Sequence, residues 1–207
     1  MKIAVIGWGS LIWCPRELAV QSKWHTDGPC LPVEFARKSG GMRVTLVLLP
    51  GTDPSRTYWA LSTEDSLEKA AGNLRLREGM KSCKQIHAAT KDPSSVFSVG
   101  GGVKPDADVA KTILDWLAGR EDLDAAIWTG LGPKEFSTRG DIPLEQQVVV
   151  FLRGLGHSDE QRAKEYIQYA PASIDTPVRR AIEKGLQWKR QELPASLFEE
   201  AEEPGDC

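Results

Sequence analysis

The sequence contains few of the residues from which proteins build cross-links and metal sites. Its four cysteines, at positions 14, 30, 83 and 207, form no CxxC pair, and its three histidines, at 25, 87 and 157, are scattered. Zinc knuckles and disulfide frameworks require a defined spacing of such residues. We therefore expect reduced thiols and no metal site.

Long apolar runs and an excess of one charge are also missing. No stretch approaches the ~20 apolar residues of a membrane span, and the apolar run before Gly7 is too short for a signal peptide. The 26 basic and 29 acidic residues give a net charge of -3, without the basic footprint of a polyanion-binding protein. These absences predict a cytoplasmic protein that binds neither nucleic acid nor membrane, and they leave its oligomeric state open.

The hydrophobic pattern predicts an α+β fold. Closely spaced apolar segments in the first third of the chain indicate strands with few helices between them, which is typical of a small barrel or a strongly bent sheet. The predicted strands span residues 2–7, 32–38, 42–49, 57–61, 85–90, 96–99 and 125–128. The predicted helices span residues 63–78, 106–117, 144–152, 159–169 and 176–189.

Local signals define two helix starts and the organisation of the chain. Ser62 and Asp65 resemble a capping box before the first helix, while Asp175 as N-cap and Pro177 in the first turn begin the last one. We expect a barrel domain over residues 1–130 flanked by helices, a helical extension over 131–197 packed on it, and a disordered acidic tail over 198–207.

The loop after the first strand begins like a dinucleotide-binding fingerprint. Gly7 and Gly9 supply Gly-x-Gly, but Ile12 stands where the third glycine is needed and Pro15 interrupts the expected helix start. A nucleotide site is therefore disfavoured. Two interpretations remain: the glycines merely permit a tight turn, or successive N–H groups ending beside Ser10 form a nest for a carboxylate or oxyanion.

A carboxylate ends the apolar stripe of the first predicted helix. Steps of four, three and four residues from Leu67 reach Ala71, Leu74 and finally Glu78, which should therefore point inward. Burial and the negative end of a helix dipole raise the pKa of carboxyl groups, which suits a general base near neutral pH.

The neighbours of Glu78 and its position at the helix end affect its expected environment. Arg75 and Arg77 lie off the stripe by helical rotation, so they need not neutralise Glu78. The alternative is that Glu78, one residue before a C-cap glycine, has frayed out of the helix into water.

Three segments together resemble the γ-glutamylcyclotransferase-like superfamily, most closely its ChaC-type branch. Residues 7–15 resemble the family's Tyr-Gly-Ser-Leu loop in the form followed by Ile-Trp-x-Pro. Residues 35–39 and 43–46 resemble its arginine-rich strand with a serine and the Val-Thr-Leu strand that follows. Residues 73–78 resemble the Tyr-Leu-x-x-Arg-Glu ending whose glutamate is the family's proposed base.

The resemblance implies a small mixed β-barrel flanked by helices and an enzyme that releases 5-oxoproline from a γ-glutamyl amine or peptide. The substrate's own amine attacks its γ-carbonyl, so no nucleophile, metal or organic cofactor is needed. Carried over by position, Glu78 is the catalytic base. The substrate-binding loop consists of Gly7, Trp8, Gly9, Ser10 and Leu11.

Two departures keep an alternative function open. Trp8 and Asn73 occupy positions where the family pattern has tyrosine. The alternative is a catalytically inactive module that binds a small molecule on the same fold.

Overall fold

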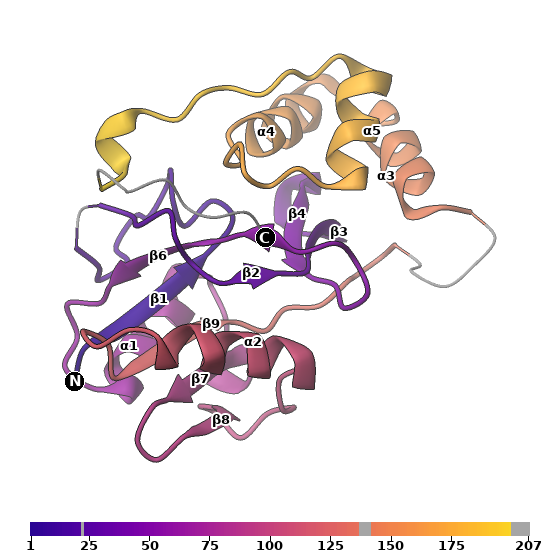
Figure 1. Ribbon diagram of the computed structural model, residues 1–207. Coiled ribbons are helices and arrows are strands. Elements are labelled where there is room, and N and C mark those ends of the chain that lie inside the picture. Colours follow the sequence, from indigo (N-terminus) through magenta and orange to yellow (C-terminus); the bar gives the residue numbers. More distant parts are fainter. Residues whose placement is uncertain (22, 137–141, 200–207) are drawn as a thin grey trace.

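The computed structural model describes residues 1–21, 23–136 and 142–199 (Figure 1). Its largest sheet has five strands in the order β6-β1-β9-β7-β8. The parallel pair β1–β9 lies in the middle, and the other pairs are antiparallel. The strands are β1 (Ile3–Gly7), β6 (Tyr58–Leu61), β7 (Ile86–Thr90), β8 (Ser95–Ser98) and β9 (Ala125–Thr129).

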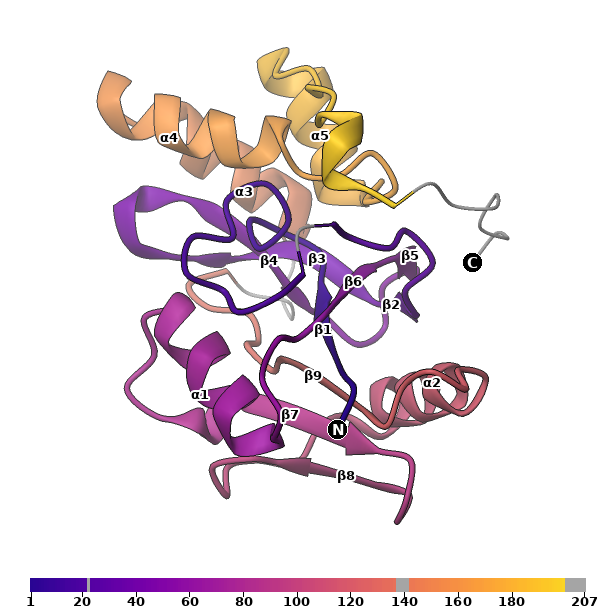
Figure 2. The same cartoon turned by 90° about the vertical axis from the view of Figure 1, so that its left-hand side faces the viewer.

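The central strands are buried on both faces, which explains their continuous apolar runs. Helix α1 (Leu67–Arg77) covers one face and α2 (Ala107–Ala118) the other (Figure 2). Residues of β1 point alternately to the two faces. Ile3 belongs to the same hydrophobic cluster as residues of α1, and Ile6 belongs to the same cluster as residues of α2. The strand period of two thus supplies apolar side chains to both helices.

A separate hairpin carries the C-terminal helices. It consists of β3 (Val33–Lys38) and β4 (Val44–Leu48), joined through the 3-10 turn η1 (Gly40–Met42). Beside it, β2 (Cys30–Leu31) pairs with β5 (Ser55–Arg56). The helices α3 (Leu144–Arg153), α4 (His157–Gln168) and α5 (Pro177–Leu186) lie over the hairpin (Figure 1).

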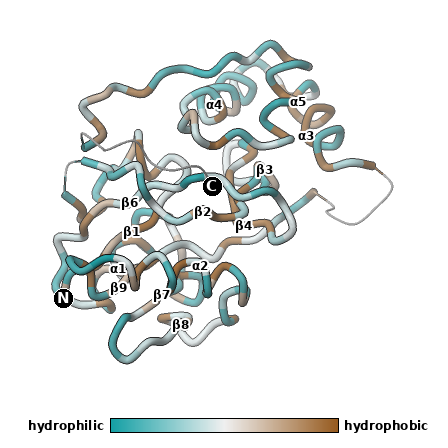
Figure 3. The backbone as a smooth tube through the Cα atoms, viewed as in Figure 1, coloured by the Kyte–Doolittle hydropathy of each residue, from teal (hydrophilic) through white to brown (hydrophobic). Residues whose placement is uncertain are grey.

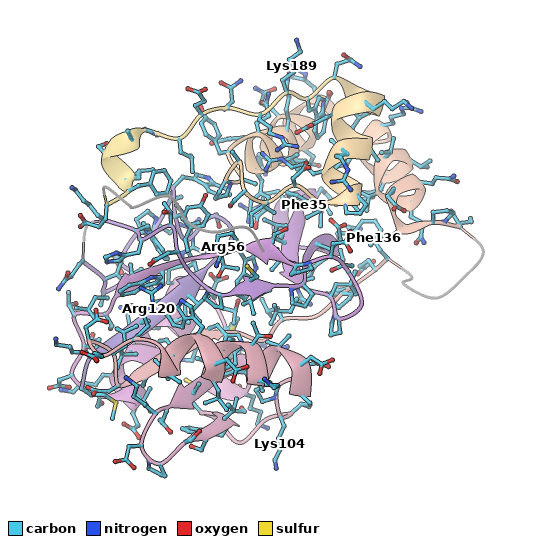
Figure 4. All side chains as sticks on the ribbon, in the orientation of Figure 1. Phe35, Arg56, Lys104, Arg120, Phe136 and Lys189 are labelled. Atoms are coloured by element: carbon cyan, nitrogen blue, oxygen red, sulfur yellow. The ribbon has the colours of Figure 1, made fainter. Side chains whose placement is uncertain are left out.

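These three helices bury one face each. Figure 3 shows hydrophilic and hydrophobic stretches alternating along α3 and α5, as amphipathic helices require. Phe35 of β3 lies where the hairpin meets the helices (Figure 4) and belongs to one core cluster with Val148, Ile167 and Ile182. The expected α+β class is confirmed.

Several details differ from the sequence expectations. The first helix begins at Leu67 rather than 63, because Ser66 is its N-cap and accepts a hydrogen bond from the Lys69 N–H. Ser62, expected in a capping box, instead accepts from the Glu64 N–H at 3.1 Å before the helix. The last helix is capped by Thr176 rather than Asp175, although Pro177 stands in its first turn as expected.

The expectations for the cysteines and the tail hold in part. Cys14 and Cys83 are free thiols, whereas Cys30 is disulfide-bonded, so the expectation of reduced thiols is wrong at that position. Phe198, assigned to a disordered tail, instead forms a β-bridge with Trp24 and packs on Tyr58. Residues 200–207 of that tail lie outside the described residues. Within the described ranges, no helix is both long and apolar enough to cross a membrane.

Arg179 holds the C-terminal helices together. Its side chain is fully buried and donates to the carbonyl oxygens of Pro171 at 2.6 Å, Ile174 at 2.8 Å and Ala170 at 2.7 Å. These carbonyls lie in the connection between α4 and α5, and Arg179 also donates at 3.3 Å to the Ile167 carbonyl in the last turn of α4, where helices leave C=O groups unpaired. The guanidinium therefore links the start of α5 to the end of α4.

Replacing Arg179 by methionine should destabilise the fold by about 3 kcal/mol or more, because several buried carbonyl groups lose their donor. Chemical denaturation measures this. The matched control is Arg180→Met on the next residue, which is exposed and, among the residues described, pairs with Asp175 alone. Surface ion pairs contribute about 0–1 kcal/mol, so equal losses in the two variants would contradict this account.

Glu34 connects the hairpin to the start of α5. Its carboxylate accepts from the Phe35 N–H at 2.7 Å, the Val178 N–H at 3.3 Å and the Thr176 hydroxyl. It is 1% exposed, and burial raises the pKa of this carboxyl above its ordinary value of 4.5, with desolvation outweighing the three hydrogen bonds. Compared with the unfolded chain, the folded state thus binds this proton more tightly.

This raised pKa predicts a pH dependence of stability. A carboxyl group whose pKa is raised by folding adds to the free energy of unfolding at pH values below 4.5, its pKa in the unfolded chain. This stabilisation is lost as pH rises through the pKa of the folded state. The difference in unfolding free energy between the wild type and Glu34→Gln, measured by denaturant titration, should therefore decrease as pH rises from about 4 to about 8. An increase over this range would show that the ionised form is the stabilised one.

Candidate functional site

A cavity of about 1140 Å³ lies where the loop after β1, the β3–β4 hairpin, the end of α1 and helix α4 meet. Four of the five predicted loop residues line it, together with Glu78. Gly7 does not, because it lies beneath the loop against the Trp24 ring. The cavity is lined by Trp8, Gly9, Ser10, Leu11, Trp13, Arg37, Lys38, Arg43, Arg77, Glu78, Arg162, Glu165 and Tyr166, among others.

Glu78 is the C-cap of α1, and its side chain is 20% exposed. It has not frayed into solvent, since its backbone N–H still donates to the Leu74 carbonyl at 3.0 Å. Its Oε1 accepts a hydrogen bond from Arg77 Nη1 at 2.7 Å. Within the described part of the chain, Oε2 accepts no hydrogen bond, so one carboxylate oxygen is open to a guest.

The sequence led us to expect that Arg77 need not neutralise Glu78, but the two side chains form an ion pair. Consecutive residues of a helix point about 100° apart, but the long arginine side chain reaches back across this angle to the C-cap carboxylate. Arg75 behaves as expected, because it turns away and donates to the Met80 carbonyl at 3.0 Å.

Arg77 also binds the glycine loop. Its Nη2 donates to Ser10 Oγ at 3.1 Å and to the Cys14 carbonyl at 2.7 Å. The side chain is 7% exposed, and its Nε is buried with no partner among the described residues. One guanidinium therefore separates Glu78 from Ser10, and the two lie on opposite sides of a group only a few ångströms wide.

The glycines of the loop are needed because other side chains pack closely against them, and not because the backbone adopts an unusual angle. Neither Gly7 nor Gly9 has a positive φ. A Cβ on Gly7 would lie 2.9 Å from the Trp24 ring, and one on Gly9 would lie 2.7 Å from the Tyr166 hydroxyl. The interpretation that these residues permit only a tight turn is therefore incomplete.

The loop also presents free N–H groups. Its turn is held by bonds from the Ile12 N–H to the Gly9 carbonyl and from the Cys14 N–H to the Ser10 carbonyl, both 3.0 Å. In the described residues, the N–H groups of Gly9, Ser10 and Leu11 donate to no acceptor, although all three residues line the cavity. Successive free N–H groups of this kind form anion-binding concavities.

The electrostatic character of the cavity favours an anionic guest. Its lining carries seven arginine and lysine side chains but three glutamates. On the hairpin side, Arg37 donates to the Gly132 carbonyl at 3.0 Å and Arg43 to the Gly40 carbonyl at 3.3 Å. Neither is in an ion pair with a described residue, so both charges remain available to a carboxylate.

Sequence reasoning missed two features of this site. Tyr166 shares a helical stripe with Ala163 and Ile167, so the pattern alone assigns it to the core. Helical rotation places Arg77 off the apolar stripe that ends at Glu78, so the pattern does not assign it to the site either. In the described ranges, no three His, Cys, Asp or Glu side chains gather to hold a metal ion.

Comparisons of the chain with protein-family models, with curated proteins and with solved structures found no match. The site is therefore interpreted from its own geometry.

The contact between Gly9 and Tyr166 makes a testable prediction. Gly9→Ala should cost about 1–3 kcal/mol of stability, because the new methyl group collides with the phenol oxygen. In a Tyr166→Phe background the nearest atom is the ring carbon, 3.7 Å from where the new Cβ would lie, which is an ordinary contact. The cost of Gly9→Ala, measured by thermal denaturation of all four proteins, should then fall. An equal cost in both backgrounds would show that the Tyr166 hydroxyl does not contact Gly9.

Proposed function

We propose that this chain is a γ-glutamylcyclotransferase-like enzyme that releases 5-oxoproline from a γ-glutamyl amine or peptide. The observation that carries the proposal is that Glu78 and three residues with free N–H groups line one cavity, with the Arg77 guanidinium bonded to both Glu78 and Ser10 Oγ. One cavity thus offers a small guest both a base and anion-binding donors.

The expected small β-barrel belongs to the same proposal, and the strand pairings support it. β1 pairs with β9, and the segment that follows β9 meets β3 through a bridge between Arg37 and Glu135. β3 continues from β2, which pairs with β5, and β5 leads into β6, which returns to β1. These contacts follow one another around a ring.

In the proposed reaction, the substrate's α-amine attacks its own γ-carbonyl carbon. The lactam C–N bond forms, the original amide C–N bond breaks, and one proton passes from the attacking amine to the leaving amine. The open Oε2 of Glu78 accepts this proton and returns it to the leaving group. The N–H groups of Gly9, Ser10 and Leu11 hold the substrate carboxylate or the developing oxyanion.

Typical free energies are consistent with Glu78 as the base and the N–H groups as oxyanion donors. Between an ordinary α-amine and an ordinary carboxyl group, proton transfer is uphill by roughly 5 kcal/mol. One preorganised oxyanion donor contributes roughly 3 kcal/mol. Holding the amine against its own carbonyl supplies several kcal/mol more.

The experiment is incubation of the purified chain with glutathione, γ-glutamyl amino acids and γ-glutamylamines, followed by mass spectrometry of 5-oxoproline. Glu78→Gln should lower turnover by at least about 10²-fold, because the amide keeps the shape but cannot accept the proton. Glu68→Gln is the matched control, since Glu68 lies in the first turn of the same helix, away from the cavity. Retention of most activity by Glu78→Gln would overturn the role of this residue.

Two observations favour a second candidate function, an inactive binding module. Arg77 already occupies one oxygen of Glu78, and Trp8 is buried where the family pattern has tyrosine. If the wild type forms no 5-oxoproline from any substrate but binds a γ-glutamyl compound in calorimetry, the binding module replaces the enzyme.

A further inference from the structure

Tyr166 reaches the cavity from the C-terminal helices, and its ring is tightly held. It lies on α4 and is 8% exposed, yet it lines the cavity. Trp13 packs edge-on against the ring at 5.4 Å between centroids, Phe35 does so at 6.4 Å, and the Arg43 guanidinium lies 5.9 Å from its centre. Contacts on several sides leave the phenol little freedom to move.

The hydroxyl of Tyr166 has an unused proton. Its oxygen accepts a long hydrogen bond from the Leu46 N–H at 3.4 Å. Among the residues that the structure describes, the hydroxyl donates to no acceptor. Burial raises the pKa of Tyr166 to about 12, so the phenol keeps its proton near neutral pH. A neutral hydroxyl with a satisfied lone pair and a free proton can act as a donor to a guest.

This hydroxyl lies beside the first of the free N–H groups. It is 2.7 Å from where a Cβ on Gly9 would lie, so only glycine leaves it room there. Glu78 and Arg77 are near enough to act electrostatically on the phenol, and both shift its pKa. The base, the N–H groups and the phenol therefore lie around one part of the cavity, and the phenol comes from a segment outside the residues that resemble the family.

We propose that Tyr166 is a catalytic residue of this site, whose hydroxyl donates a hydrogen bond to the γ-carbonyl oxygen as that oxygen becomes an oxyanion. The inference rests on the proposed function and goes beyond it by giving the C-terminal helices a part in the chemistry. Tyr166 makes and breaks no covalent bond. Its proton stays on the phenol while the transferred proton passes between the two amines through Glu78.

The test compares kcat and KM of the wild type, Tyr166→Phe and Tyr169→Phe with the γ-glutamyl compound that the wild type turns over best. Tyr169 is the matched control because it ends the same helix and does not line the cavity. Loss of one oxyanion donor should lower kcat about 10²-fold in Tyr166→Phe and change KM less than about threefold. Tyr169→Phe should leave both constants unchanged.

Circular dichroism spectra identify a temperature at which every variant is folded, and all rates are measured at that temperature. A lower kcat then reflects catalysis and not unfolding. A kcat of Tyr166→Phe within about threefold of the wild type would overturn the inference and leave the proposed function standing. A loss confined to KM would also overturn it, because that result assigns ground-state binding to the phenol. Absence of 5-oxoproline from the wild type itself would overturn the proposed function and this inference together.

Discussion

The guanidinium of Arg77 is the contact on which the candidate site depends. It binds Glu78 at 2.7 Å, Ser10 Oγ at 3.1 Å and the Cys14 carbonyl at 2.7 Å. In the part of the chain that the structure describes, no other side chain links Glu78 to Ser10 or Cys14. Because the side chain is nearly buried, each of these hydrogen bonds is stronger than its counterpart in water. The same contact leaves the second carboxylate oxygen of Glu78 open to the cavity.

The C-terminal helices complete this arrangement through a second buried arginine. Arg179 joins the end of α4 to the start of α5, and Glu34 joins that start to β3. Because α4 is held in this way, Tyr166 meets the hairpin at Leu46 and the loop at Gly9. The helical part of the chain thus contributes to the cavity as well as covering the hairpin.

Much of the fold could be predicted from local patterns. Apolar runs located the central strands within one or two residues, since strands buried on both faces carry few polar residues. Helix starts were less accurate. Ser66 caps α1 in place of Ser62, because serine caps a helix wherever the chain turns into it, and two serines four residues apart give the same local signal.

The sequence by itself determined that Glu78 ends an apolar stripe and that a glycine loop follows the first strand, because helical period and glycine spacing are properties of neighbouring residues. Tertiary structure alone decided what these groups meet. Arg77 bridges 67 positions of sequence to Ser10, and Tyr166 approaches Gly9 from a helix formed much later in the chain. No local pattern records such contacts, since they arise only when folding brings the loop after β1, the end of α1 and helix α4 together around one cavity.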